Sequence, residues 1–551
     1  MKKTLQLLLV LLLLLLLFFQ SNAQGISSHQ WQKDLRFLQN TIHKDYASLF
    51  VKTTKEEFDQ EVEKLYNEIP TLSEHEIVIG MTKLVASFKY GHTGIFFSLN
   101  PMKFHQFPFN LYQFKDGIYI QGTSTTYPQA LGAKVLKVNG LPVAEALEKI
   151  YPVVNAENSQ YFKSYGINFL SIAEVLHTQK ITKTLQDSIE LTLEKDGKVF
   201  SQSFNAMEKG DRVPKKYSLV QQNENWLDAR DQSTTPLYLK HLSKIYFFEH
   251  LENEKTVYIR HSNIANDPNE STESFYNRIF DFIEKNDVEK LVIDVRLNGG
   301  GNSYLNKTII KGIIKSKIDT VGSLYVIVGR RTYSACQNLV NELDNYTNAI
   351  FVGEPTAENV NFWGDANAVF LPNSKMPVYL SFAWWQGKPQ WEYAEWLAPQ
   401  VPVEMTFKEY VSNQDPVLDT VLSFDGKGFI RNPMEYIGNL FVSGDVEKLT
   451  TETPKIVNDP RYAFVDFEAE FNKIGERLIE GHPEANTMAV QLFSFSTQLF
   501  PNSVITWKNF GESYLKIGDT NKAIEILNKT LAMKPDAAIT EEVKVLLQKA
   551  M

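Results

Sequence analysis

Apolar residues at helical spacing mark the first hundred positions of the chain. Two runs recur every three or four positions: Trp31, Leu35, Leu38 and Ile42, followed by Phe58, Val62, Leu65 and Ile69. Thr54 and Glu57 have the spacing of a capping box, in which each side chain accepts a backbone N–H of the other residue at a helix start. A third helix is predicted from Leu72 to about Phe88. We therefore expect residues 24–100 to form an N-terminal helical segment.

The pattern changes to short strands and turns between residues 101 and 215. Asp116-Gly117 and Asn139-Gly140 favour the tight turns of β-hairpins, because these residue types tolerate a positive φ. Residues 192–200 predict one more hairpin. The range 101–215 is therefore predicted to be a β-rich domain. The stretch from residue 201 to about residue 236 is polar and weakly periodic, which is typical of a linker.

Beyond that linker, short apolar strands alternate with segments of helix length. The strand candidates are 256–260, 291–295, 324–328 and 349–352, and the helix candidates between them are 271–285, 304–316 and 334–346. This alternation is typical of a largely parallel sheet with helices on its faces. We expect residues 216–424 to form an α/β core.

The last part of the chain, residues 425–551, is predicted to be helical. It carries a period of about 34 residues, the length of a tetratricopeptide repeat. The residues at the expected positions are Trp507, Gly511, Tyr514, Ala523, Leu527 and Pro535, and a degenerate repeat is predicted at about 470–503. The alternative is two ordinary helical hairpins. Such repeats bind partners or pack on their own chain, so we expect a protein partner here and no chemistry.

The composition is that of a folded protein, and the N-terminal pattern predicts export. The 551 residues are 43% apolar and 22% charged, with a formal net charge of −9, which offers no electrostatic footprint for nucleic acid. Residues 1–23 have two lysines, an apolar run and small residues before the predicted cleavage site, which indicates a signal peptide. The apolar run is too short for a membrane anchor, so no membrane span is expected in the mature chain. Cys336 is the single cysteine and is predicted to be a buried filler.

Two motifs carry candidate chemistry. Leu291–Asn302 is an apolar run that closes on three glycines, and Ser334 follows a second apolar run. Glycines let a backbone approach a ligand closely, and a serine beside such amides has the layout of a nucleophile with an oxyanion hole. The candidate oxyanion donors are the amides of Gly299, Gly300 and Ala335. The alternative for Ser334 alone is an ordinary helix N-cap.

A serine nucleophile needs a base, and His92 is the candidate. It lies in Tyr90-Gly-His-Thr-Gly94, where glycines on both sides predict a tight turn that presents the ring. The alternative is a histidine in a surface turn. The sequence has no zinc-binding helix, phosphate loop or dinucleotide fingerprint, so we expect neither a metal nor a cofactor.

Four ordered motifs resemble those of the C-terminal processing (tail-specific) serine peptidases, which include the tricorn core protease and the interphotoreceptor retinoid-binding protein. They are Asp294-Val-Arg-Leu-Asn-Gly-Gly-Gly301, Thr332-Tyr-Ser-Ala-Cys-Gln-Asn338, Gly353-Glu-Pro-Thr356 and Tyr90-Gly-His-Thr93. Residues 128–143 resemble the PDZ-type segment that many members carry, which would capture an extended peptide by strand addition. The resemblance covers roughly residues 75–405. It implies a fold related to crotonase and Clp protease subunits, with Ser334 as the nucleophile.

The resemblance also distinguishes two branches of that family. One branch uses a lysine as base, and this chain has Asn359 at the corresponding position. The tricorn-like branch uses a histidine and a glutamate, which implies His92 as the base and Glu392 as the acid that orients it. Glu395 is the alternative acid.

These observations predict an exported serine endopeptidase, periplasmic or extracellular, that cleaves peptides or proteins through a Ser–His–Glu site. The alternative is a catalytically inactive family member that binds peptides or an apolar ligand. That alternative is motivated by the missing lysine and by the tryptophan-rich segment 384–396.

Overall fold

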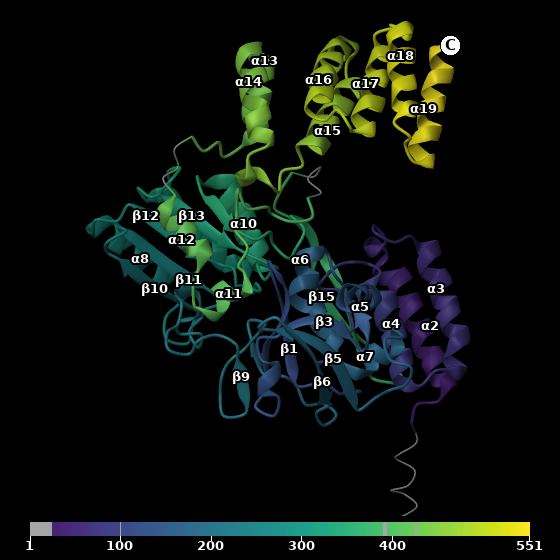
Figure 1. Cartoon of the computed structure of the whole chain (residues 1–551), viewed down its shortest axis with the longest axis vertical. Coiled ribbons are helices and arrows are strands. Elements are labelled where there is room, and N and C mark those ends of the chain that lie inside the picture. Colours follow the sequence, from purple (N-terminus) through teal and green to yellow (C-terminus); the bar gives the residue numbers. More distant parts are fainter. Residues whose placement is uncertain (1–24, 100, 390–393, 425, 427) are drawn as a thin grey trace, which may run out of the picture. The chain divides into compact units, whose positions relative to one another are not determined.

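The computed structural model describes residues 25–99, 101–389, 394–424, 426 and 428–551 (Figure 1). Its contacts divide the chain into two compact units. The first is built from the chain up to Pro399 together with Val403–Asp425, and the second from Gln400–Pro402 together with Gly426–Met551. The predicted signal peptide lies outside the described residues. Within the described part, no helix combines the length and apolar character that crossing a membrane requires.

Three helices form at the start of the first unit, as their apolar spacing predicts. They are α2 (Ser28–Asp45), α3 (Lys55–Glu68) and α4 (Glu74–Ala86). The capping box at the start of α3 is present: the Thr54 side chain accepts from the Glu57 N–H, and the Glu57 carboxylate accepts from the Thr54 N–H. The apolar residues of these helices are buried in one large cluster together with those of the β-rich part that follows.

A mainly antiparallel sheet follows these helices. Its strands are β1 (Phe109–Phe114), β2 (Gly117–Ser124), β3 (Lys134–Val138), β5 (Ser188–Lys195) and β6 (Lys198–Asn205), in that spatial order, with β4 (Leu141–Pro142) beside β3 and β9 (Trp226–Asp228) beside β2. The predicted turn at Asn139-Gly140 is confirmed, because both residues have a positive φ, of 50° and 79°. Short elements complete this region: α5 (Val143–Ile150), α6 (Ser159–Tyr161), α7 (Ala173–Thr178), β7 (Lys215–Lys216) and β8 (Leu219–Val220).

The predicted parallel sheet is present in the first unit. Its strands run β10 (Tyr246–Leu251), β11 (Thr256–His261), β12 (Lys290–Asp294), β13 (Leu324–Val328) and β14 (Ile350–Gly353), in that order. The pairs from β11 to β14 are parallel, whereas β10 is an antiparallel edge strand within the region where the sequence indicated a strand only from residue 256. The helices between the strands are α8 (Thr272–Lys285), α9 (Asn306–Lys315) and α10 (Ala335–Tyr346). Parallel strands place the turns that follow β12 and β13 at one edge of the sheet.

A long hairpin and two helices complete the first unit. The hairpin joins β15 (Asn361–Phe370) to β16 (Pro377–Gln386), and α11 (Phe407–Val411) and α12 (Pro416–Ser423) follow. An isolated bridge joins Gly94 to Tyr379 of β16, so the hairpin contacts the turn that carries His92.

The second unit contains the short strand β17 (Val401–Pro402) and a series of helices. These are α13 (Pro433–Ser443), α14 (Val446–Val457), α15 (Phe467–Glu480), α16 (Asn486–Leu499), α17 (Val504–Lys516), α18 (Thr520–Ala532) and α19 (Ala537–Ala550). Gly511 of α17 lies against Leu527 of α18, where a Cβ would come within 2.6 Å of the leucine side chain. Glycine is therefore needed for the close approach of these two helices.

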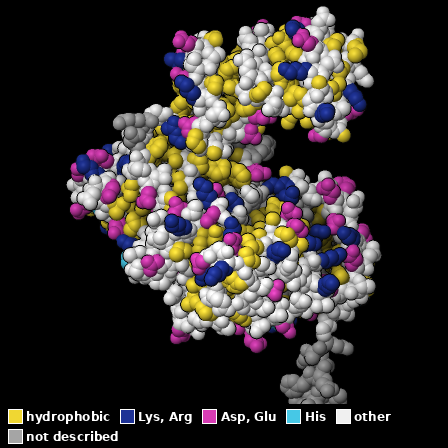
Figure 2. All heavy atoms as spheres, viewed as in Figure 1, with side chains coloured by type: hydrophobic (Ala, Val, Ile, Leu, Met, Phe, Trp, Pro, Cys, Tyr) yellow, Lys and Arg dark blue, Asp and Glu magenta, His cyan; other side chains and the backbone are white. Residues whose placement is uncertain are grey.

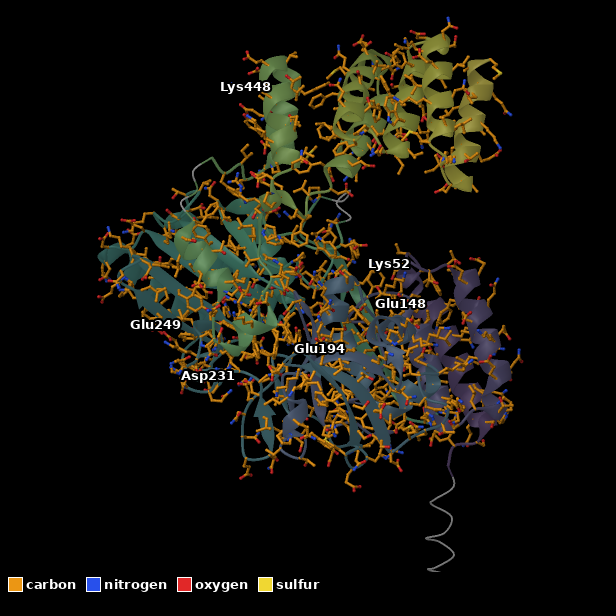
Figure 3. All side chains as sticks on the ribbon, in the orientation of Figure 1. Lys52, Glu148, Glu194, Asp231, Glu249 and Lys448 are labelled. Atoms are coloured by element: carbon orange, nitrogen blue, oxygen red, sulfur yellow. The ribbon has the colours of Figure 1, made fainter. Side chains whose placement is uncertain are left out.

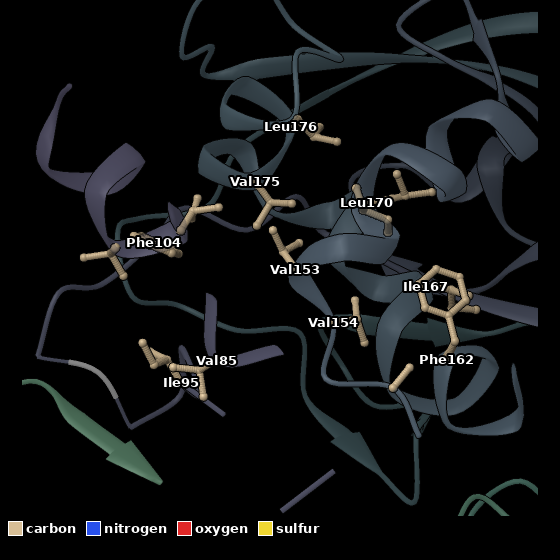
Figure 4. Packing of buried hydrophobic residues seen from close by; sticks show 14 of the residues in the cluster. Val85, Ile95, Phe104, Val153, Val154, Phe162, Ile167, Leu170, Val175 and Leu176 are labelled. Atoms are coloured by element: carbon tan, nitrogen blue, oxygen red, sulfur yellow. The ribbon is translucent and has the colours of Figure 1, made fainter. Parts of the chain in front are cut away.

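Buried apolar side chains form separate cores under the two sheets of the first unit. Figure 4 shows part of the first core, which includes Val85, Ile95, Val153 and Val154. The second core lies around β11, β12 and β13, whose side chains are buried on both faces. On the face shown in Figure 2, Lys, Arg, Asp and Glu side chains of both signs are interspersed with neutral ones.

Candidate active site

The end of β12 is held by a buried ion-pair network. Arg296 contacts Asp294 and Asp415, each at 2.8 Å. The charges that the sequence places at the end of this strand therefore pair structurally. The Arg296 backbone N–H also donates to Asp294, at 3.1 Å. This network positions the start of the glycine-rich loop that follows the strand.

Ser334 lies at the start of α10 in a strained backbone conformation. Its φ of 58° and ψ of −127° are unusual for a residue with a side chain, and its hydroxyl makes no capping bond to the helix. Such strain costs about 1–3 kcal/mol and persists only where the surrounding structure imposes it. The hydroxyl is thereby presented towards the sheet edge and is free for another role, in contrast to the N-cap alternative.

The structure brings His92 to Ser334 across 242 residues of sequence. His92 Nε2 lies 3.0 Å from Ser334 Oγ, a hydrogen-bond distance. The imidazole stacks with two aromatic rings, with centroid distances of 4.7 Å to Tyr333 and 6.0 Å to Phe362. Strand β16 fixes the turn, because the Gly94 N–H donates to the Tyr379 carbonyl at 2.9 Å. The ring is thus held by aromatic packing and by the anchored turn.

The other nitrogen of His92 faces Tyr333 and a buried carboxylate. His92 Nδ1 lies 2.7 Å from the Tyr333 hydroxyl and 3.1 Å from Glu358 Oε1. Glu358 Oε1 has no well-aligned hydrogen-bond partner among the described residues, so the aligned partner of Nδ1 is the tyrosine hydroxyl, which also lies near enough to Glu358 to act on its pKa. The Ser334 N–H donates to the other carboxylate oxygen, Glu358 Oε2. Glu358 therefore contacts both ends of the serine–histidine pair.

Burial sets the protonation of this group. Desolvation lowers the pKa of His92, which keeps the ring neutral and able to accept a proton at neutral pH. Burial raises the pKa of Glu358 well above its ordinary value, against the opposing effect of the Ser334 N–H and the Tyr333 hydroxyl. A positive charge on His92 would draw that carboxyl back towards its ionised form.

A second buried carboxylate, Glu157, binds the backbone of the turn that carries His92. It accepts the Gly91 N–H at 2.8 Å and the Asn359 N–H at 3.2 Å. Burial, followed by the charge of Glu358, raises the pKa of Glu157 to about 8. Lys52, labelled in Figure 3, is near enough to oppose that rise. Glu157 therefore ties the turn before His92 to the loop that follows Glu358.

The glycine loop lies directly against the serine. A Cβ on Gly300 would come within 2.6 Å of Ser334 Cβ and within 2.9 Å of the Ala335 nitrogen, so only glycine fits there. The Gly300 N–H donates to Asn298 Oδ1 at 2.9 Å and is thus occupied, unlike the free oxyanion donor expected from the sequence. Ala335 is the first residue of α10, so its N–H has no acceptor within the helix. Gly299 lies on the exposed side of the loop.

The glutamate that the structure brings to His92 is Glu358, which was not among the predicted acids. Glu392 lies outside the described residues. Glu395 is exposed, and its backbone carbonyl accepts from Asn158. Glu358, which does contact His92, is adjacent to Asn359, the position where the related branch has its lysine. That adjacency is the one sequence signal that could have found it.

Three side chains of the candidate site are also grouped closely enough to hold a metal ion. One ligand atom each from His92, Glu157 and Glu358 lies within 4.8 Å of the others. Both Glu157 oxygens and one Glu358 oxygen accept backbone N–H groups, so the cluster is satisfied largely by the protein itself.

Cys336, two residues after Ser334, is buried, and burial raises the pKa of its thiol well above the ordinary value. A thiolate nucleophile is therefore disfavoured.

A cavity of about 590 Å³ opens beside the histidine. Its walls are mostly apolar and aromatic, and they include Phe96, Phe97, Tyr161, Tyr165, Phe169 and Tyr379. His92, Tyr333 and Gly299 lie on its wall, so a molecule in the cavity would reach the serine–histidine pair. A cavity of this size and character is suited to apolar side chains of a ligand.

Comparison with known proteins identifies a shared fold. No protein-family model matches the sequence, and no curated protein sequence matches it significantly. Mature CPAF aligns over 74% of this chain and 99% of its own, with 12% identity and a TM-score of 0.51. Its complex with lactacystin aligns over 72% and 98%, also with 12% identity and a TM-score of 0.51. The photosystem II D1 C-terminal processing protease aligns over 74% and 98%, with 12% identity and a TM-score of 0.33. The chain is thus similar in its mixed α/β fold to CPAF.

Proposed function

We propose that this protein is a serine peptidase in which Ser334 is the nucleophile and His92 the general base. The observation that carries the proposal is the 3.0 Å approach of His92 Nε2 to Ser334 Oγ, between two motifs 242 residues apart. A neutral, buried imidazole facing a serine hydroxyl in a strained turn is the arrangement that nucleophilic acyl transfer needs. The family resemblance of the surrounding motifs supports the same assignment.

The proposed reaction begins with proton transfer from Ser334 Oγ to His92 Nε2 while the oxygen attacks a peptide carbonyl carbon. The carbonyl oxygen becomes an oxyanion, which the N–H groups of Ala335 and Gly299 would stabilise. His92 then gives the proton to the leaving amine nitrogen as the C–N bond breaks. Water, deprotonated by His92, hydrolyses the resulting acyl-enzyme and restores the serine hydroxyl.

We assign the acid to Glu358, acting through Tyr333. With Nδ1–H of His92 donating to the tyrosine hydroxyl, and that hydroxyl donating to Glu358, Nε2 is left as the proton acceptor that the reaction requires. The imidazolium formed during attack is then stabilised by the carboxylate 3.1 Å away. Glu392, which the family resemblance favours, stays the rival for this role.

The remaining expectations concern the setting of the enzyme. The leader pattern in residues 1–23 supports an exported peptidase, periplasmic or extracellular, that acts on peptides or proteins. Residues 101–215 would serve as a PDZ-like domain that captures an extended peptide. The helices of residues 425–551, with the tetratricopeptide-like spacing, would bind a protein partner.

The test is covalent labelling of the purified mature protein by a fluorophosphonate, with the adduct mapped by mass spectrometry. We expect labelling at Ser334 that is absent in Ser334→Ala and strongly reduced in His92→Ala. Circular dichroism and thermal unfolding of both variants serve as folding controls. A folded wild-type protein that is not labelled would contradict an activated serine.

The second candidate function is binding without catalysis, of peptides or of an apolar ligand. The apolar cavity beside His92 and the occupied Gly300 amide favour it. It predicts that an apolar fluorophore such as anilinonaphthalene sulfonate binds equally to the wild type and to Ser334→Ala, and that the wild type cleaves no member of a peptide library. Cleavage that disappears in Ser334→Ala would exclude this candidate.

A further inference from the structure

Two cations lie at the aromatic cavity and a third is near one of them in the sequence, and all three lack an ion pair within the described part of the chain. They are Arg212, Lys215 and Arg331, and none of them forms an ion pair with any residue that the structure describes. The neighbouring arginines differ: Arg330 pairs with Glu354, and Arg296 pairs with two aspartates. In a chain with a net charge of −9, a group of unpaired cations next to the candidate active site calls for a physical reason.

Arg212 and Arg331 are both placed at the cavity. Arg212 is part of its wall, and its guanidinium donates to the Phe97 carbonyl at 2.9 Å. The Arg331 guanidinium lies 5.1 Å from the ring centre of Tyr165, a wall residue, and a Cβ on Gly299 would be 3.7 Å from Arg331 Nη2. Arg331 donates to the Ser218 hydroxyl at 2.5 Å, while its buried Nε has no hydrogen-bond partner. The guanidinium therefore keeps donor capacity beside the glycine loop.

Lys215 follows Arg212 by three positions, and both arginines are close enough to repel its ammonium. Desolvation by the surrounding protein lowers the pKa of the Lys215 ammonium, and the positive charges of Arg331 and Arg212 add to this effect. Together they bring the pKa to about 8. Like charges held together in this way destabilise the free protein, and an anion bound among them would relieve the repulsion. The cavity wall itself carries no carboxylate within the described part of the chain.

We propose that this cavity is the specificity pocket of the site and that it takes a substrate segment combining a large apolar side chain with a carboxylate. The apolar group would pack against the aromatic wall, and the carboxylate would contact Arg212, Arg331 and Lys215. Arginine suits this role because its planar fork binds carboxylates with two parallel hydrogen bonds. The inference rests on the proposed function, because it names the substrate class of that site. The carboxylate belongs either to an acidic side chain or to the C-terminus of the substrate.

Peptide binding to the full-length Ser334→Ala protein tests this independently of turnover. The probes are fluorescein-labelled octapeptides of alanine with one phenylalanine, in which an aspartate is moved through the four positions after it. Each has an asparagine isostere, and one further pair compares a free C-terminus with its amide. Fluorescence anisotropy at low and high salt gives the affinities. We expect one carboxylate register to bind about tenfold more tightly than its neutral partner, as hydrogen bonds to a charged group imply.

Variants locate the effect. In the same Ser334→Ala background, Arg212→Gln combined with Lys215→Gln should remove the preference for the carboxylate, and so should Arg331→Gln. Lys311→Gln, an exposed cation of α9 outside the cavity wall, should preserve it. Weakening of the preference by high salt is expected for a charged contact. The side-chain and C-terminal pairs show which carboxylate is bound.

Equal affinity of all carboxylate peptides and their neutral partners would overturn the inference, and so would a preference that survives loss of the three cations. Absence of binding by every peptide would overturn it as well. Cleavage by the wild type without any carboxylate preference would contradict this inference but would still support the proposed peptidase. A preference lost with the cations, in a protein whose wild type cleaves nothing, would uphold the pocket and sink the peptidase.

Discussion

Replacing Gly300 by alanine tests how tightly the glycine loop packs against the nucleophile. The added Cβ would lie 2.6 Å from Ser334 Cβ, 2.8 Å from the Tyr333 carbonyl oxygen and 2.9 Å from the Ala335 nitrogen. Two of these three atoms are backbone, so they cannot rotate away. Gly300 also has a φ of +100°, which side-chain-bearing residues rarely adopt.

The structure sets the size of the effect. To restore a contact of 3.4 Å, Ser334 Cβ and the alanine Cβ must separate by about 0.8 Å, and a displacement of about 1 Å at a reacting group costs about 100-fold in rate. The unfavourable φ adds about 1–3 kcal/mol of strain to the folded state. We therefore expect Gly300→Ala to slow fluorophosphonate labelling of Ser334 by roughly 30- to 100-fold, and to lower the urea midpoint of the first unit.

Gly299→Ala is the matched control. Its Cβ would meet nothing closer than Arg331 Nη2 at 3.7 Å, and its backbone amide is retained. It should label within about threefold of the wild type. The assay is the second-order labelling rate, with urea unfolding followed in parallel. If Gly300→Ala labelled as fast as Gly299→Ala, the serine would not be held against this glycine and the oxyanion geometry proposed above would be wrong.

Three further predictions address the carboxylates and the helical unit. Glu358→Gln should slow labelling of Ser334 by about 100-fold or more, because the carboxylate that stabilises the imidazolium is lost. Glu395→Gln, at an exposed position, should have no effect. The reverse result would assign the acid to Glu395, and a loss only in Glu392→Gln would assign it to Glu392. Glu157 has a pKa of about 8 in the folded chain against an ordinary 4.5, so the folded state holds the extra proton and stability is lost as the pH rises through this window, by about 1.4 kcal/mol per pH unit. Urea unfolding at several pH values should show a slope that is steeper by this amount in the wild type than in Glu157→Gln, which keeps the contribution of Glu358. Equal slopes would refute the burial argument. Gly511→Ala should destabilise the second unit by about 1–3 kcal/mol, because the added methyl group would overlap with Leu527. Gly438→Ala is the control: open space surrounds this position in α13, so the variant should be slightly more stable than the wild type. Equal thermal unfolding of the two variants would contradict the packing of α17 against α18.

Much of the local structure follows from the sequence because it depends on neighbours in the chain. The capping box of α3 and the Asn139-Gly140 turn are local interactions, and both are present. The parallel strands β11 to β14 follow from apolar runs separated by helices, since a strand buried on both faces needs such a run. The antiparallel edge strand β10 was not predicted, because an edge strand depends on its partner more than on its own pattern.

The sequence by itself determined the candidate nucleophile and base, since Ser334 and His92 lie in short motifs whose glycines and flanking strands indicate their roles locally. Only the tertiary structure showed which carboxylates of the described residues lie beside His92 and its turn. Glu358 lies 3.1 Å from His92, and Glu157 joins the His92 turn to the loop after Glu358 through the Gly91 and Asn359 N–H groups. The physical reason is that burial and side-chain hydrogen bonding between segments more than two hundred residues apart depend on how the sheets pack, which no local pattern contains. The lack of ion pairs at Arg212, Lys215 and Arg331, within the part of the chain that the structure describes, likewise depends on the tertiary structure and is not visible in the sequence.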